Sequence, residues 1–264
     1  MAGTLRAPII AAMGGRGTLL DRRGVRIMRV ALHLLRGVQT ILFSFPFLTP
    51  RRRTSAVRRW SRRLLRILGV RLHVHGQTPH RGAGKPAMLV ANHVSWLDIV
   101  VINAVLPVRF VAKSEIRRWP VIGWLSERTG TLFIERARRR DTARITRLVS
   151  DALLAGDVCA VFPEGTTTDG TRVLPFHSSL LQPALLADAR VYPAALRFER
   201  ADATLCTEAA YDGDKSLWQT LRAIAAQPVI HAHVWFLEPI SAAGSRRRVL
   251  AVTARDVIAR RLAS

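Results

Sequence analysis

The residues with the clearest chemical potential are a histidine and an aspartate five positions apart, His93 and Asp98. They follow Ala87–Ala91, which has the length and composition of a buried strand and ends abruptly in Asn92 and His93. A carboxylate that accepts one ring N–H of a histidine leaves the other ring nitrogen free to take a proton from a hydroxyl group. The spacing therefore predicts a general base, His93, that Asp98 orients.

A predicted helix start places this pair. Ser95 and Asp98 form an S-x-x-D pattern immediately before the apolar run 99–106, and this pattern is typical of a capping box with Ser95 as the N-cap. His93 then lies in the turn between strand and helix. The pattern also has a purely structural interpretation, in which Asp98 only caps the helix and His93 is an ordinary turn residue. The pair alone favours that interpretation, so the functional hypothesis depends on segments further along the chain.

Composition limits the possible classes of protein. The chain has 264 residues, 49% of them hydrophobic, which is enough for one large domain or two small ones. Its formal net charge is +23, and residues 1–80 contain sixteen arginines but one acid, Asp21. This asymmetry predicts an anionic partner, either a membrane surface or a nucleic acid. Cys159 and Cys206 lie on separate apolar segments and are interpreted as buried thiols of a reducing compartment.

The first 70 residues are predicted to attach the protein to a membrane. Residues 1–24 are rich in glycine and arginine, lack the pattern of a secretion signal and are expected to be poorly ordered. In residues 25–70 the uninterrupted apolar part, 37–48, is shorter than the about 20 residues that span a bilayer, so we expect it to lie at the interface or in one leaflet. Residues 51–71 predict a basic amphipathic helix with an interfacial tryptophan, Trp60.

Two alternatives remain for this basic region. Its helices could be core or solvated helices of a globular domain. The charge could also belong to a non-enzymatic binder of anionic membranes or nucleic acid. A nucleic-acid partner would require base-stacking aromatics or a recognition fold. Residues 51–71 contain one tryptophan and no tyrosine, so no nucleic-acid partner is expected.

From about residue 70, short apolar runs alternate with longer amphipathic ones, which is typical of α/β proteins. We predict an α/β domain over residues 71–264, with a central, mostly parallel or mixed sheet flanked by helices. The expected strands are 71–75, 87–91, 109–112, 131–134, 158–162, 191–198 and 228–236, and the expected helices are 96–105, a broken 116–128, 139–154, 179–188, 217–225 and 253–262.

Polar segments at the ends of four predicted strands carry a family resemblance. They are N-H-x-S-x-x-D at residues 92–98, F-I-x-R at 133–136, F-P-E-G-T at 162–166 and the stretch around Pro193, with F-V-A-K-S-E-I at 110–116 between the first two. In this order the segments resemble the glycerolipid acyltransferase family, typified by bacterial 1-acylglycerol-3-phosphate acyltransferases. The resemblance covers about residues 72–198.

The resemblance implies transfer of an acyl group from an acyl carrier protein or CoA thioester to the free hydroxyl of a lysolipid, without cofactor or metal. A thioester is already activated, so no protein nucleophile is needed, and the chain has no G-x-S-x-G elbow. Backbone N–H groups near Gly165 or at the helix start after His93 are candidate oxyanion donors. The residues carried over are catalytic His93 and Asp98, substrate-binding Lys113, Arg136, Glu164, Gly165 and Thr166, and supporting Asn92, Ser95 and Pro193.

Two positions depart from family members whose acceptor carries a phosphate. Thr167 stands where such members often have arginine, and His177 stands where they often have lysine. The expected acceptor is lysophosphatidate, giving phosphatidic acid. The alternative acceptor is a lyso-ornithine lipid, since the sequence around Thr167 also resembles the branch of the family that acylates lyso-ornithine lipids. The resemblance and the basic front end imply a monotopic or peripheral protein on the cytoplasmic face of a bacterial inner membrane.

Two further histidine pairs could mark a metal site. His73 and His75, and likewise His231 and His233, are two residues apart on predicted strands, so each pair shares one face. No third ligand is apparent in the sequence. Packed or exposed strand histidines are therefore expected rather than a metal centre.

Overall fold

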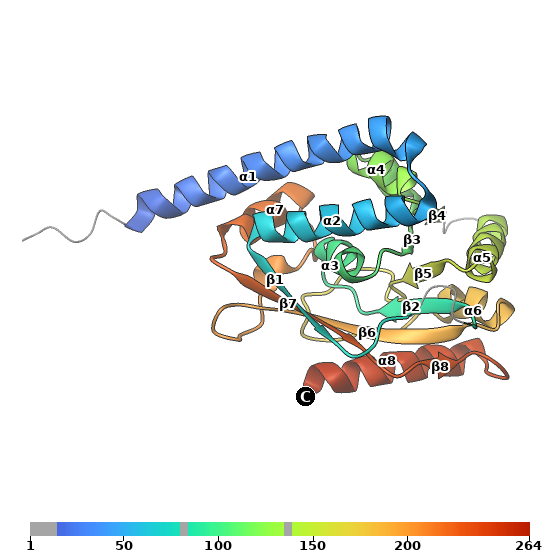
Figure 1. Cartoon of the computed structure of the whole chain (residues 1–264). Coiled ribbons are helices and arrows are strands. Elements are labelled where there is room, and N and C mark those ends of the chain that lie inside the picture. The colour runs from blue at the N-terminus through green and yellow to red at the C-terminus, as the bar shows by residue number, and fades with distance from the viewer. Residues whose placement is uncertain (1–14, 80–83, 135–138) are drawn as a thin grey trace, which may run out of the picture.

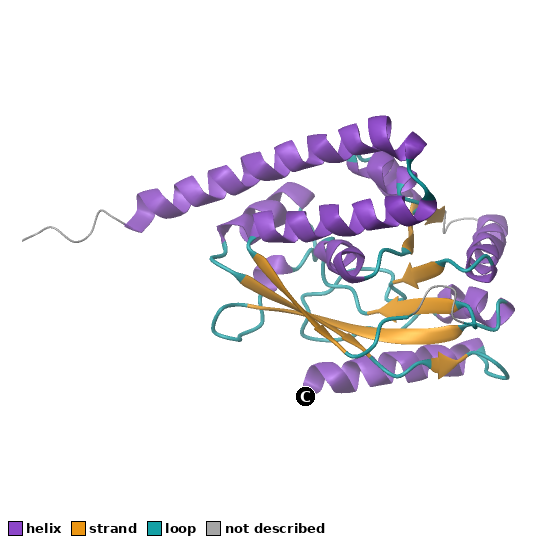
Figure 2. Cartoon of the chain, in the orientation of Figure 1, coloured by secondary structure: helices purple, strands orange, loops and turns teal. Residues whose placement is uncertain are grey.

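A computed structural model describes residues 15–79, 84–134 and 139–264. A mixed sheet lies between two layers of helices, which confirms the predicted α/β fold (Figures 1 and 2). The strands described are β1 Val70–His75, β2 Ala87–Ala91, β3 Arg109–Lys113, β4 Leu132–Ile134, β5 Val158–Val161, β6 Arg190–Glu199, β7 Ile230–Phe236 and β8 Ile240–Ser241. The α-helices are α1 Gly15–Gln39, α2 Pro50–Leu68, α3 Leu97–Val105, α4 Ile122–Arg128, α5 Arg139–Leu154, α6 Gln182–Leu186, α7 Leu217–Ala226 and α8 Arg247–Ala263.

The sheet order β1-β7-β6-β2-β5-β3-β4 puts β2 near its centre, and β8 pairs with β6. Strand β2 is parallel to both neighbours, β5 and β6, and all five of its residues are buried. Strand β7 is antiparallel to β6 and parallel to the edge strand β1. The carboxyl ends of β2, β5 and β3 therefore meet at one edge of the sheet, and the loops after these strands are brought together there.

Helices cover both faces of the sheet (Figure 1). On one face α2 packs against α3, and its apolar side, which includes Leu64, Leu65 and Leu68, is buried as its periodicity predicted. On the opposite face α8 packs along β6. Helix α8 begins at Arg247, six residues before the predicted start, because Leu250 and Ala251 already belong to the face that it buries.

Helices α1 and α2 form a hairpin that lies over the sheet (Figure 1). A π-helix, Thr40–Ser44, and a 3₁₀ turn, Phe45–Phe47, connect them. Residues 25–68 are helical apart from the short connection, as predicted, and α1 begins at Gly15, inside the segment that was expected to be poorly ordered. Adding residues to a formed helix is easier than nucleating one, so the apolar part of α1 can carry the glycine-rich start with it. Residues 1–14 lie outside the described part of the chain.

The hairpin is held by a histidine–tryptophan contact. The rings of His33 in α1 and Trp60 in α2 stack with centroids 4.8 Å apart. His33 Nε2 lies 2.9 Å from the Trp60 carbonyl oxygen, and Trp60 Nε1 donates to the His33 carbonyl at 3.2 Å. Gly37 leaves room for the indole, because a Cβ at this position would lie 2.8 Å from Trp60 Nε1 and force a shift. The two helices consequently approach closely at the level of Trp60.

A single arginine ties the other half of α1 to the domain. The guanidinium of Arg26 donates to the carbonyl oxygens of Ala225, Gln227 and Pro228, at 3.2 Å for Ala225 and 3.0 Å for Pro228. These carbonyls belong to the end of α7 and the residues after it, where a helix leaves acceptors unpaired and favours a cation. The run Arg22–Phe47 is long and apolar enough to cross a membrane by length and composition, and in the structure one side of it packs on the domain.

The two histidine pairs meet in one ladder on strands β1 and β7. His73 Nε2 lies 2.9 Å from His231 Nδ1, and His75 Nε2 lies 3.3 Å from His233 Nδ1. The rings of His73 and His233 stack at 4.5 Å, and Trp235 continues the stack. These histidines pair with one another, and within the described residues no three or more metal-ligating side chains are placed so that they could hold one metal ion.

Stability is expected to fall as the pH drops below about 6.5, the pKa of a histidine in an unfolded chain. Burial lowers the pKa of His33 and of His233. The native state therefore binds fewer protons at these sites than the unfolded state, and the free energy of unfolding decreases while the pH falls through 6.5 toward the lowered values. Urea unfolding measured at intervals from pH 8 to 5.5 tests this. A His33→Gln/His233→Gln variant should show a shallower decrease, and an equal decrease would contradict the prediction.

Candidate active site

The predicted catalytic pair is assembled at the carboxyl end of β2. His93 Nδ1 lies 2.7 Å from Asp98 Oδ2, and the Asp98 side chain is fully buried. The same oxygen accepts the backbone N–H of Val94 at 2.7 Å and of Ser95 at 2.9 Å. Three donors thus fix the carboxylate on the Nδ1 side of the ring. The structure assigns no hydrogen-bond partner to Nε2 among the described residues, so this nitrogen is available as a base.

The helix start differs from the predicted capping box. Helix α3 begins at Leu97, and Trp96 stands at its N-cap without a side-chain cap bond. Asp98 reaches back to the Ser95 N–H, which is one half of a capping box, but the buried Ser95 hydroxyl makes no hydrogen bond among the described residues. The chain turns one residue later than the pattern suggests, because the Asp98 carboxylate collects two backbone N–H groups together with the histidine ring.

The main chain of His93 is held by the loop after β5. Its N–H donates to Glu164 Oε1 at 2.7 Å, and its carbonyl accepts the Thr168 N–H at 2.9 Å. Its ring stacks on Phe162 with centroids 4.0 Å apart and planes 10° apart. Because β5 is the parallel neighbour of β2, residues 162–168 leave the sheet beside His93. The two motifs therefore form one unit.

The supporting residues tie β2 to β6. Asn92 Nδ2 donates to the Leu196 carbonyl at 2.9 Å, and Asn92 Oδ1 accepts the Leu196 N–H at 2.8 Å. Pro193 is buried in β6 opposite Val90, and its carbonyl accepts the Leu237 N–H at 2.9 Å. Both residues fix the strand that ends at His93, and neither lines the cavity described next.

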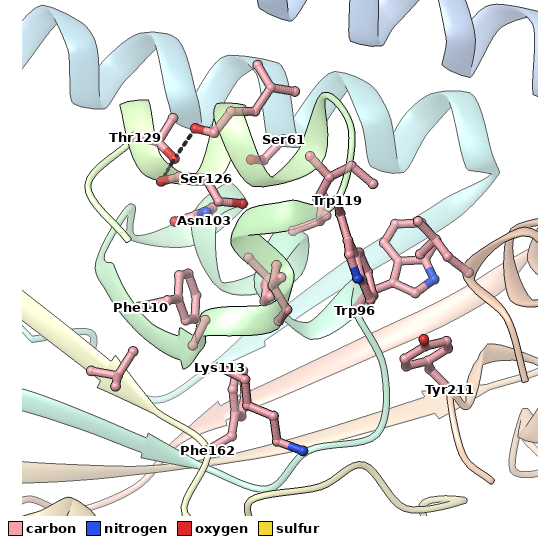
Figure 3. A pocket seen from close by; sticks show the side chains of 18 of the residues that line it. Ser61, Trp96, Asn103, Phe110, Lys113, Trp119, Ser126, Thr129, Phe162 and Tyr211 are labelled. Atoms are coloured by element: carbon pink, nitrogen blue, oxygen red, sulfur yellow. Dashed lines mark hydrogen bonds between the residues drawn. The ribbon is translucent and has the colours of Figure 1, made fainter. Parts of the chain in front are cut away.

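His93 lines a cavity of about 670 Å³ whose walls are mostly apolar. The cavity runs beneath the helical hairpin, between α3 and the segment that contains η3 (Ser114–Arg118) and α4. In Figure 3 Phe162 and Lys113 lie at one end and Ser61 and Asn103 lie toward the other. The residues contributed by the hairpin are Leu34, Gly37, Thr40, Ile41, Phe45, Ala56, Val57, Trp60, Ser61 and Leu64.

The predicted substrate-binding residues take different positions. Lys113, at the end of β3, is exposed and lines the cavity with Gly165 and Thr166. Glu164 is buried beneath them, does not line the cavity and accepts the Leu174 N–H at 2.8 Å through Oε2. Burial raises the pKa of its carboxyl group. The prediction for Arg136 falls outside the described residues.

Three of the backbone N–H groups considered as oxyanion donors are engaged in this structure. The Gly165 N–H donates to the Phe162 carbonyl at 3.1 Å, with Gly165 at the positive φ of 75° that favours glycine. The N–H groups of Val94 and Ser95 are taken by Asp98. These three N–H groups therefore serve to hold the loops around His93.

Sequence reasoning missed several cavity residues. Trp96 lies inside the N-H-x-S-x-x-D block, and its position between Ser95 and the helix could have marked it as a wall residue. Trp119 and Tyr211 also line the cavity (Figure 3). Thr167 donates its hydroxyl to the Tyr211 carbonyl. Nothing in the sequence connects Tyr211 with Thr167, because only the folded loops bring them together.

Comparison with known proteins places this geometry in a family. Residues 71–197 match the family model described as Acyltransferase. The lyso-ornithine lipid O-acyltransferase of Pseudomonas aeruginosa is 36% identical over 206 residues, which cover 78% of both chains. The chain belongs to the acyltransferase family. It is an acyltransferase of the lysophospholipid type, as the ordered motifs predicted.

This acyltransferase is also similar to a second relative in sequence and to a solved structure in fold. The 1-acyl-sn-glycerol-3-phosphate acyltransferase of Neisseria meningitidis is 42% identical over 149 residues, which cover 56% of this chain and 58% of that one. The 1-acyl-sn-glycerophosphate acyltransferase PlsC of Thermotoga maritima has the same fold, with a TM-score of 0.71, 21% identity and coverage of 94% of this acyltransferase and 96% of that structure.

Proposed function

We propose that the protein transfers a fatty acyl group from a thioester of acyl carrier protein or CoA to the free hydroxyl of a lysolipid, with His93 as the general base. The observation that carries the proposal is an imidazole held by a buried carboxylate, with its other nitrogen available at a large apolar cavity. Thioester and alcohol are sufficient reactants, so the reaction needs no further cofactor.

His93 Nε2 takes the proton of the lysolipid hydroxyl while the oxygen attacks the thioester carbonyl. The tetrahedral intermediate collapses with cleavage of the C–S bond, and the thiolate receives the proton from the imidazolium. Asp98 stabilises that imidazolium through its bond to Nδ1, and Phe162 holds the plane of the ring. An acyl chain is the apolar ligand that suits the cavity under the hairpin.

For the acceptor we favour a lyso-ornithine lipid over lysophosphatidate, the reverse of the order inferred from the sequence. Among the described residues Lys113 is the one lysine or arginine that lines the cavity, and it is accompanied by an acid, Glu115. Thr167, which stands where a phosphate reader often has arginine, is bonded to Tyr211. The relatives from Pseudomonas aeruginosa and Brucella abortus, named lyso-ornithine lipid O-acyltransferases, are covered over 78% and 79% of their lengths.

Lysophosphatidate is the second candidate. Arg136, outside the described residues, would complete a phosphate site together with Lys113, and the Neisseria meningitidis relative is named for that acceptor. One assay decides between them: purified protein in mixed micelles with acyl-CoA or acyl–acyl carrier protein, and either lyso-ornithine lipid or lysophosphatidate. Turnover of lysophosphatidate alone would reverse our choice of acceptor. Turnover of neither acceptor with either donor would refute the proposed reaction.

The same reaction requires contact with a membrane, and we propose that the tip of the helical hairpin provides it. Phe43 and Phe47 are 72% and 86% exposed, whereas Ile41 and Phe45 of the same turn are buried and line the cavity. Arginines of α2, such as Arg58 and Arg59, are exposed and can contribute about 1 kcal/mol each at an anionic surface. Because Arg26 fixes α1 to the domain, we propose that the protein is monotopic and does not span the bilayer. The family resemblance suggests that it lies on the cytoplasmic face of a bacterial inner membrane.

A Phe43→Glu/Phe47→Glu variant is expected to bind anionic vesicles at least about tenfold more weakly than the parent, since two large apolar side chains would leave the bilayer. Cosedimentation with vesicles that contain anionic lipid measures the change. A Leu148→Glu variant, altered at an exposed apolar residue of α5, is the matched control and should bind like the parent. Equal loss in both variants would contradict docking through the hairpin tip.

A further inference from the structure

Glu164 is a buried acid that the proposed reaction does not use. It is 4% exposed, and it does not line the cavity, although Phe162 before it and Gly165 after it do. Family resemblance places it among the residues that shape the acceptor pocket, and its geometry gives it a different role. Its two oxygens face two backbone N–H groups, those of His93 and Leu174.

We propose that Glu164 is a positioning residue that sets the place of the His93 ring by holding the backbone N–H of His93 and tying it to that of Leu174. The inference rests on the proposed function, because it concerns the base of that reaction. His93 has four fixed points: its N–H on Glu164, its carbonyl on Thr168, its Nδ1 on Asp98 and its ring face on Phe162. Asp98 sets the rotation of the ring, and Glu164 sets the backbone from which the ring projects.

Only a carboxylate meets this demand. Both of its oxygens accept, so it can satisfy two N–H groups that approach from different loops. A glutamine of the same size presents one acceptor and one NH₂ group, and the NH₂ group would face one of the two backbone N–H donors. An aspartate is one methylene shorter and cannot reach both donors. The native bonds of 2.7 and 2.8 Å are short, as expected for N–H donors to an ionised acceptor.

Opposing influences act on the pKa of the Glu164 carboxyl group. Burial raises the pKa of the Glu164 carboxyl group, and the nearby Asp98 carboxylate acts in the same direction, while the two N–H bonds and His93 oppose them. Burying a carboxyl group carries a desolvation cost, and here the two backbone N–H bonds offset part of it. A ring displaced by about 1 Å can lower a rate by about 10²-fold, so a rigid anchor at His93 has a kinetic effect.

The test is Glu164→Gln, assayed for kcat and for KM of the lysolipid, with the Nδ1–H proton resonance of His93 followed by NMR in detergent. We expect kcat to fall about 30- to 100-fold, KM to change less than threefold and the downfield Nδ1–H resonance to shift or broaden. Glu208→Gln is the matched control. Glu208 forms an ion pair with Arg200 at 2.7 Å, and neither residue lines the cavity, so this variant should leave all three values unchanged.

Three results would overturn the inference. A raised KM with parental kcat would mean that Glu164 contacts the acceptor. A fall in kcat that matches the unfolded fraction, with the Nδ1–H resonance unchanged, would mean that the residue is only structural. Parental values throughout would mean that it has no role. If the glutamine variant does not fold, Glu164→Asp is judged by the same criteria. A parent protein without turnover refutes the proposed reaction instead, and the resonance alone then decides whether Glu164 positions the ring.

Discussion

Replacing His93 with alanine is expected to lower kcat by about 10³-fold and to leave the fold intact. General-base catalysis contributes about 10²–10⁴-fold to a rate, and no second base is bonded to this site among the described residues. The imidazole is partly exposed, so its removal leaves a small gap at the cavity rather than a hole in the core. Steady-state acyl transfer, with circular dichroism as the check on folding, measures the effect.

The control for this experiment is His75→Ala. His75 is exposed on the edge strand β1, where it contacts the histidine ladder and Trp235, and it does not line the cavity, so its loss should change kcat by less than twofold. Full turnover in His93→Ala would refute the general-base mechanism. Loss of activity accompanied by an unfolded spectrum would instead assign His93 a structural role.

Replacing Asp98 with asparagine is expected to lower both the rate and the stability. The N–H groups of Val94 and Ser95 point at Oδ2, so they should orient the amide with its oxygen in that place and preserve the Nδ1–H tautomer of His93. The lost charge no longer stabilises the imidazolium, and we expect kcat to fall by about 10²–10³-fold. The NH₂ group then occupies the buried site of Oδ1, which has no partner among the described residues, at a cost of about 1–3 kcal/mol of unfolding free energy.

Measuring the two effects separately identifies the role of Asp98. Urea unfolding gives the stability, and kcat determined well below the melting temperature gives the rate of the folded variant. A destabilised variant that retains parental kcat would mean that Asp98 is only a cap for α3. Parental stability and parental kcat together would contradict both roles that the contacts assign to its carboxylate.

Apolar runs and helical periodicity predicted the helices and strands that have a clear pattern of their own. The predicted bounds of the strand Ala87–Ala91 and of the helix Arg139–Leu154 agree with the structure at both ends. The strand is apolar throughout, and the helix has a helical period with polar flanks. The start of α1 was missed because its glycines oppose helix formation when they are considered alone. The capping box was half correct, since the Asp98 carboxylate binds more groups than a helix start requires.

The site could be predicted as a set of motifs but not as a set of contacts. His93 and Asp98 are five positions apart, and their hydrogen bond follows from the turn between them. The bond from His93 to Glu164 joins residues 71 positions apart, and the role inferred for Glu164 depends on it. The cavity was not predictable either, because its wall residues, such as Val57 and Ile99, have the same apolar character as core residues.

The hydrogen bonds from Arg26 to residues 225–228 have a consequence for biosynthesis. The acceptors are 199 to 202 positions later in the chain than Arg26, so these hydrogen bonds cannot form until residues 225–228 have been synthesised. At about 5–20 residues per second, this delay is about 10–40 s. The apolar and arginine-rich hairpin is synthesised before these acceptors, so during this interval part of the surface on which it docks does not yet exist. A nascent chain that reaches a bilayer in that interval would be attached before its catalytic domain is complete.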